Sequence, residues 1–119
     1  MEFEFKKLNK SLESRKKQSN TIKNSFPDKI PIICERDPKS NLPDLDKHKY
    51  LVPMYLTVNQ FIFMIRKRLG IEKEDPLYFI VNGKDFISGE STISDIYEKY
   101  KDYQDELLYV AYTDIPKWL

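Results

Sequence analysis

The sequence predicts an α+β domain in which one long amphipathic helix packs across a mixed sheet. Three observations support this: the length, the alternation of strand-like and helix-like apolar patterns, and capping signals between them. The chain has 119 residues, of which 40% are hydrophobic and 33% charged, as expected for one compact domain. A single cysteine excludes a disulfide framework.

Residues 12–26 predict a basic helix that ends before Pro27. Proline disfavours a helical conformation in the residue before it and lacks the amide needed to continue a helix. A basic run at residues 15–17 accompanies the apolar stripe. The stripe follows helix-compatible steps of seven, three and four and comprises Leu12, Ser19, Ile22 and Phe26.

Two strands are predicted next. Residues 30–34 are short, rich in β-branched side chains and bounded by Pro27 and Pro38. Residues 49–52 form the second strand, and Pro53 either ends it or marks a sheet edge, because proline cannot donate to a ladder. The polar connection between them is short enough to return the chain alongside the first strand.

The clearest element is a helix that begins after Thr57. Thr57 and Gln60 have the spacing of a capping box, and Gly70 supplies a left-handed stop. The apolar stripe between them comprises Val58, Phe61, Ile62, Ile65 and Leu69.

The remaining elements complete the sheet. Residues 77–81 form an apolar run typical of a buried strand, and Asn82-Gly83 indicates a two-residue hairpin leading into Phe86-Ile87. Thr92 has the cap spacing of a short helix, and residues 107–112 read as a last strand. Two strands, a long helix and further strands are the chain order of the β-grasp.

Catalytic chemistry has little support. His48 and Cys34 are each the only residue of their kind, so no metal cluster or His-Cys-Asp arrangement can be assembled except as a bare pair. We expect Cys34 to be a small buried hydrophobe and His48 to be solvated. Three glycines form no phosphate-binding loop, and we expect no cofactor and no enzyme activity. No apolar run approaches the roughly 20 residues of a membrane span, which predicts a cytosolic or nuclear protein.

Charge is unevenly distributed. Residues 1–68 hold 15 basic and 8 acidic residues, whereas residues 69–119 hold 5 and 11. This polarity favours an acidic partner on the N-terminal side, or is a solvated face. The run at residues 15–17 could likewise approach anionic lipid or remain solvated. Nucleic-acid binding is disfavoured, because the isoelectric point is about 7.7 and the second half is acidic.

Residues 47–53 have two open interpretations. A strand that ends in proline, carries apolar side chains and is flanked by lysines is what an edge offered to an extended peptide would look like. An ordinary edge strand protected from aggregation by its lysines would look the same.

Several segments together closely resemble the autophagy ubiquitin-like modifiers, the family of GABARAP and the microtubule-associated-protein light chain. The matching segments are residues 26–33, 44–53, 56–58, 60–61, 65–68, 79–82, 96–98 and 108–112. The resemblance implies a ubiquitin-like β-grasp (28–119) with two additional N-terminal helices (1–27) packed on it, together a single domain. It also implies a monomeric autophagy adaptor for cargo recruitment and autophagosome formation, cytoplasmic and able to reach autophagosome or other vesicle membranes.

The resemblance further implies binding of short aromatic-x-x-aliphatic peptides with acidic neighbours, paired along residues 49–52. We use "aromatic hollow" for the set Ile22, Pro31, Lys49, Leu51 and Leu107, with Lys49 as lid. We use "aliphatic hollow" for the set Tyr50, Val52, Pro53, Leu56, Phe61, Met64 and Ile65. The acidic flanks of the peptide would meet Lys47, Lys49 and Arg68.

Three departures from the family pattern are present. Members carry a glycine near the C-terminus that is exposed by trimming and joined to phosphatidylethanolamine, whereas Leu119 stands there. The chain as given would therefore not be conjugated to that lipid, and either a longer natural chain or a non-conjugated paralogue would account for this. Gln18 and Leu107 replace an acid and a phenylalanine, which predicts a more neutral, reshaped aromatic hollow. Residues 83–85 replace a proline-containing segment.

Overall fold

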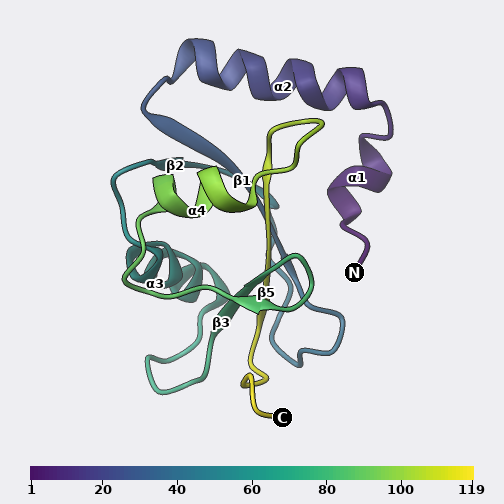
Figure 1. Ribbon diagram of the computed structural model, residues 1–119. Helices are drawn as coiled ribbons and strands as arrows, with labels where there is room; N and C mark the ends of the chain where they lie inside the picture. The colour runs from purple at the N-terminus through teal and green to yellow at the C-terminus, as the bar shows by residue number, and fades with distance from the viewer.

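The computed structural model describes residues 1–119 as a five-stranded mixed sheet with helices on both faces (Figure 1). The predicted order of elements is confirmed, including the two N-terminal helices that the family resemblance implies. The elements are α1 (Glu4–Leu8), α2 (Leu12–Ser25), β1 (Lys29–Arg36), β2 (Lys49–Pro53), α3 (Val58–Leu69), β3 (Tyr78–Val81), β4 (Asp85–Phe86), α4 (Ile93–Tyr100) and β5 (Leu108–Thr113).

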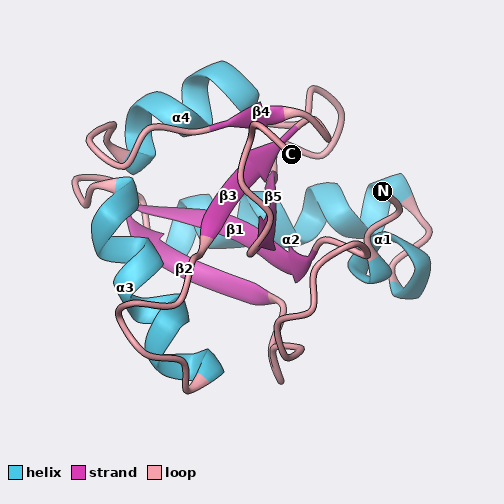
Figure 2. Cartoon of the chain, turned by 90° about the horizontal axis from the view of Figure 1, so that it is seen from below, coloured by secondary structure: helices cyan, strands magenta, loops and turns pink.

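The strands lie in the order β2-β1-β5-β3-β4. The central pair, β1 and β5, is parallel, and β2, β3 and β4 each run antiparallel to their neighbours. A parallel central pair built from the first and last strands, with a helix between, is the β-grasp arrangement. The predicted α+β class is therefore confirmed, and β2 is one edge of the sheet (Figure 2).

Local signals set the ends of α3. The Thr57 hydroxyl accepts from the Gln60 amide at 3.2 Å, and the Gln60 side chain accepts from the Thr57 amide at 2.8 Å. Gly70 ends the helix in the left-handed region, with φ of 68°. Both predicted signals are confirmed, so this helix begins and ends where its sequence alone indicates.

The two faces of the sheet are covered differently. On one face, α3 and α4 cover the main core, which includes Val52, Phe61, Ile65, Phe79 and Tyr112. On the other face lie α1 and α2, over a small apolar cluster of Phe5, Ile33 and Leu107. Cys34 is fully buried in the main core, as expected. Side chains of successive strand residues thus enter two separate apolar layers.

Two expectations about local structure are wrong. The apolar stripe of α2 does not include Phe26, which is 44% exposed, whereas Arg15 in the basic run is buried. The turn after β3 has three residues, because Val81 pairs with Asp85. Asn82 and Gly83 both adopt positive φ, as the dipeptide predicts, but Lys84 is needed to close the connection. None of the helices is both long and apolar enough to cross a bilayer.

Candidate functional site

The outer side of β2 carries backbone groups that the sheet does not use. The Cys34 amide donates to the His48 carbonyl at 2.8 Å, and the Met54 amide donates to the Asp28 carbonyl at 2.9 Å. Hydrogen-bonded residues alternate along an antiparallel ladder, so Lys49 and Leu51 direct their N–H and C=O groups away from β1. Pro31 lies opposite Leu51, where the ladder needs no amide donor. The free edge therefore has the N–H and C=O groups of two residues, Lys49 and Leu51, available for hydrogen bonds to another strand.

This edge has a definite end. Pro53 has no N–H, and its carbonyl accepts from the Leu56 amide at 3.2 Å. An added strand could therefore hydrogen-bond to β2 only from Lys49 to about Leu51. Side chains along β2 alternate: Tyr50 and Val52 are buried, whereas Lys49, Leu51 and Pro53 are half-buried. Tyr50 and Val52 of the aliphatic hollow therefore lie on the face opposite Lys49 and Leu51 of the aromatic hollow, and Pro53 lies at the end of the strand.

The structure brings most of the aromatic hollow together but leaves little of it accessible. Leu51 pairs with Pro31 across β2 and β1, and Leu107 directly precedes Leu108, the partner of Ile32 in β5. Leu51, Pro31 and Leu107 thus form a row across three strands. Leu107 has no exposed surface, since it packs in the cluster with Phe5 and Ile33. It can only form the floor of a hollow.

The helical part of this hollow comes from α2. Ile22 reaches the same face of the sheet and is buried, but it is outside the Leu107 cluster. Lys49 donates from its Nζ to Gln18 Oε1 at 2.9 Å, so the predicted lid is joined to α2. An entering aromatic ring would have to displace the Lys49 side chain or move Ile22.

The aliphatic hollow lies between β2 and α3. Val52, Phe61 and Ile65 are fully buried and belong to the main core, and Tyr50 meets the edge of the Phe61 ring at a centroid distance of 6.1 Å. The accessible members of this hollow are Pro53, Leu56 and Met64, the last 38% exposed. The structure thus provides an apolar floor with a partly exposed rim.

Two of the three expected cationic residues, Lys47 and Arg68, lie beside Tyr50, whereas Lys49 contacts Gln18. Lys47 and Arg68 lie over the Tyr50 ring at 5.3 and 5.4 Å, and the Tyr50 hydroxyl donates to the Lys47 carbonyl at 2.6 Å. Burial raises the pKa of Tyr50 to about 12, so it remains a neutral hydroxyl at physiological pH. Arg68 also pairs with the exposed Asp46 at 3.8 Å. The positive charge at this edge is therefore only partly balanced.

A buried ion pair that local sequence patterns do not reveal joins α2 to the segment between α4 and β5. Arg15 Nε donates to Asp105 Oδ2 at 2.9 Å, and its Nη1 donates to the carbonyls of Asn9 and Lys10. The Tyr109 hydroxyl donates to the same carboxylate oxygen at 2.5 Å. Arg15 is thus a structural residue and not part of a basic surface, which corrects the interpretation of the run at residues 15–17.

The expectation that His48 is simply solvated is also wrong. His48 is half-buried, with its Nδ1 3.4 Å from Glu35 Oε2. The Glu35 carboxylate accepts from the first amides of α1, those of Glu4 at 2.7 Å and Phe5 at 2.9 Å. A buried acid on β1 therefore attaches α1 to the sheet, as expected for a carboxylate at a helix N-terminus.

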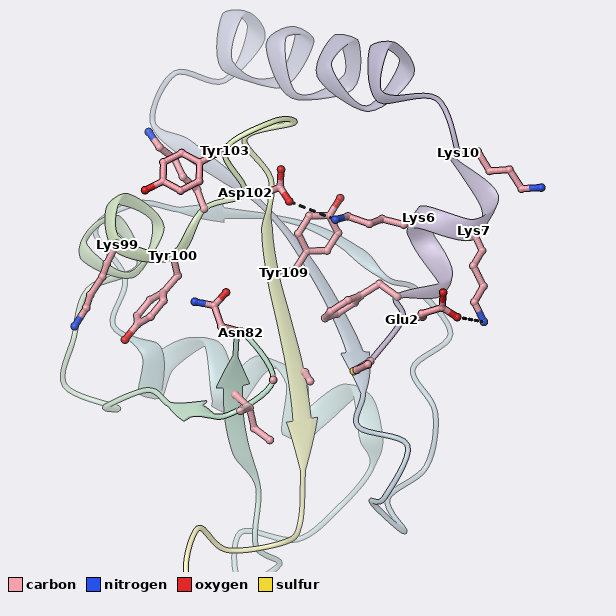
Figure 3. A pocket seen from close by; sticks show the side chains of 16 residues that line it. Glu2, Lys6, Lys7, Lys10, Asn82, Lys99, Tyr100, Asp102, Tyr103 and Tyr109 are labelled. Carbon is pink, nitrogen blue, oxygen red and sulfur yellow. Dashed lines mark hydrogen bonds and ion pairs between the residues drawn. The ribbon is translucent and has the colours of Figure 1, made fainter.

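Two cavities of the molecule are lined by residues outside β2. One of about 900 Å³ opens between α1, the segment after α4, the end of β3 and the middle of β5 (Figure 3). Within this cavity, Lys6 Nζ donates to Asp102 Oδ2 at 3.3 Å and lies over the Tyr109 ring. The Lys10 side chain points away from the cavity (Figure 3). A second, of about 340 Å³, adjoins Glu35 and His48. No residue of either predicted hollow lines these cavities.

The chain has no group of three or more side chains able to hold a metal ion.

The family described as "Autophagy protein Atg8 ubiquitin like" matches residues 14–118. A crystal structure of ATG8 from Trypanosoma brucei is similar over 95% of this chain and 95% of that one, with 36% identity and a TM-score of 0.88. A match of this extent covers both the sheet and its helical cover. The chain therefore belongs to the Atg8 family of ubiquitin-like autophagy proteins.

Proposed function

We propose that this chain is an autophagy adaptor that captures aromatic-x-x-aliphatic peptides as an extra strand on β2. The peptides would come from autophagy receptors and machinery, and the complex would serve cargo recruitment and autophagosome formation. The adaptor would work in the cytoplasm and reach autophagosomal membranes through such partners.

The observation that carries this proposal is the free edge at Lys49 and Leu51. Its backbone groups point away from β1, and half-buried or buried apolar side chains of β2 lie on each face beside it. An extended peptide also alternates its side chains between two faces. One anchor can therefore enter each hollow while the peptide backbone pairs with β2.

The expected affinity is modest. Each buried anchor contributes roughly 1.5 to 3 kcal/mol, from which the loss of rigid-body and side-chain freedom is subtracted. The net result should be a dissociation constant of micromolar order. Opening the aromatic hollow would reduce the binding free energy further. Either Lys49 must break its hydrogen bond to Gln18, or the buried Ile22 side chain must move.

An aromatic-x-x-Leu peptide with acidic neighbours tests the proposal by calorimetry and by amide chemical shifts. We expect Leu51→Ala to weaken binding at least tenfold, because it removes apolar surface shared by the edge and the aromatic hollow. Leu8→Ala is the matched control, since Leu8 is 74% exposed on α1. The largest shift changes should fall on Lys49 and Leu51. Equal affinities of the two variants, or shifts confined to the 900 Å³ cavity, would refute the site.

A further inference from the structure

One buried polar side chain of the protein has no hydrogen-bond partner. Ser19 on α2 is 1% exposed, and its Oγ is the only buried side-chain nitrogen or oxygen that forms no hydrogen bond. Buried hydroxyls are normally paired, because a hydroxyl taken out of water without a partner keeps its desolvation penalty. A serine hydroxyl can both donate and accept. Ser19 therefore brings unused hydrogen-bonding capacity into the interior.

Ser19 lies beside the aromatic hollow. Only Arg15, Ser19 and Ile22 of α2 are buried, so these residues form the face of the helix that is turned to the sheet. Ile22, a wall of the hollow, follows Ser19 by three residues, and Arg15 precedes it by four, so both are its neighbours on this face. Arg15 pairs with Asp105, whose Oδ1 accepts from the amide of Leu107, the floor of the hollow. Ser19 is thus placed between a wall residue and the segment that carries the floor.

The polar side chains around Ser19 are already paired. The Asp105 carboxylate accepts from Arg15 and from the Tyr109 hydroxyl. Gln18, the residue before Ser19, uses both its amide oxygen and its amide nitrogen in hydrogen bonds. A polar atom that entered this part of the hollow would therefore find its free partner in Ser19.

The depth of Ser19 decides which aromatic side chains can reach it. Ser19 and Leu107 are almost completely buried, whereas the Lys49 lid is half-buried. An aromatic ring that entered past Lys49 would approach Ser19 with the ring atoms farthest from its own backbone. In tyrosine this tip is a hydroxyl, and in phenylalanine it is a C–H group. Since two hydroxyls can each donate and accept, a tyrosine tip would pair with Ser19.

We propose that Ser19 is a specificity-determining residue that makes the aromatic hollow prefer tyrosine to phenylalanine. The inference rests on the proposed function and names the anchor that the hollow selects, so the ligand class is a Tyr-x-x-aliphatic peptide. A phenylalanine anchor would gain apolar burial only and would leave the Ser19 hydroxyl without a partner, as it is in the free chain. Movement of Ile22, one of the two ways to open the hollow, would also uncover Ser19, because the two residues are neighbours on one helix face.

Two peptides that are identical except for Tyr or Phe at the aromatic position test this by calorimetry. The unmodified chain should bind the Tyr peptide about two- to tenfold more tightly, the range of one net hydrogen bond. Ser19→Ala should remove this preference, because the tyrosine hydroxyl would then be buried without a partner. The same variant should keep the urea midpoint of the unmodified chain or raise it, since no hydrogen bond within the fold is lost. A lower midpoint would mean that the hydroxyl is bonded within the fold, which would overturn the inference.

Ser14→Ala is the matched control, because Ser14 is exposed on the same helix. It should keep the preference for the Tyr peptide. An unchanged preference in Ser19→Ala, or an equal loss in Ser14→Ala, would overturn the inference. Equal affinities of the unmodified chain for the two peptides would overturn this inference alone, whereas binding of neither peptide would refute the proposed function itself.

Discussion

Replacement of Asp105 by asparagine should destabilise the protein strongly, because its carboxylate is the partner of a buried cation. The Asp105 side chain has no exposed surface and meets Arg15 at 2.9 Å. Its other oxygen accepts from the Leu107 amide at 2.9 Å, a bond that asparagine can keep. Asp105→Asn therefore removes the charge with almost no change of shape.

The magnitude follows from what remains around Arg15. Breaking a buried ion pair by changing one partner costs about 3 to 5 kcal/mol, because the other charge stays desolvated. Arg15 keeps two carbonyl acceptors, on Asn9 at 2.7 Å and Lys10 at 2.9 Å. We therefore expect the lower end, about 3 kcal/mol, together with looser docking of α2 on the sheet.

Urea denaturation followed by circular dichroism measures this loss as a change in the free energy of unfolding. Asp46→Asn is the matched control, since it removes the same charge from an exposed pair with Arg68 and should cost less than about 1 kcal/mol. A free energy of unfolding for Asp105→Asn within 1 kcal/mol of the unmodified chain would contradict the reasoning. So would equal losses in the two variants.

Three further outcomes are expected. Lys47→Ala should weaken peptide binding less than Leu51→Ala, and the difference from the unmodified chain should fade as salt is raised in calorimetric titrations. Gly70→Ala should lower the free energy of unfolding by about 1 kcal/mol, because alanine is strained at φ of 68°; an unchanged urea midpoint would exclude this. Stability should fall as the pH drops below about 4. Burial opposes ionisation of Asp102, but backbone amides and Lys6 hold its pKa below the usual range, and the Ser40 hydroxyl lowers that of Asp114. These carboxylates stabilise the fold at pH values above their unfolded pKa and lose that contribution when they are protonated. A melting temperature that stays constant between pH 5 and pH 2 would contradict the predicted loss of stability.

Local signals in the sequence determined the order and type of the elements. The cap at Thr57, the stop at Gly70 and the apolar runs act between residues a few positions apart, so they can be recognised without knowledge of the fold. The peptide edge was predicted partly on the same basis, from Pro53 and the flanking lysines, and its position at the border of the sheet is confirmed. Its ligand stays a prediction.

The tertiary structure alone decided which polar side chains are buried and what they contact. Arg15 is 90 residues from Asp105, and nothing in a run of three basic residues distinguishes the one that is buried. The zero exposure of Leu107 and the link between Lys49 and Gln18 likewise depend on α1 and α2 docking on the sheet. Such pairings arise only when distant segments meet, because desolvation and charge partners are properties of the assembled surface and not of neighbouring residues.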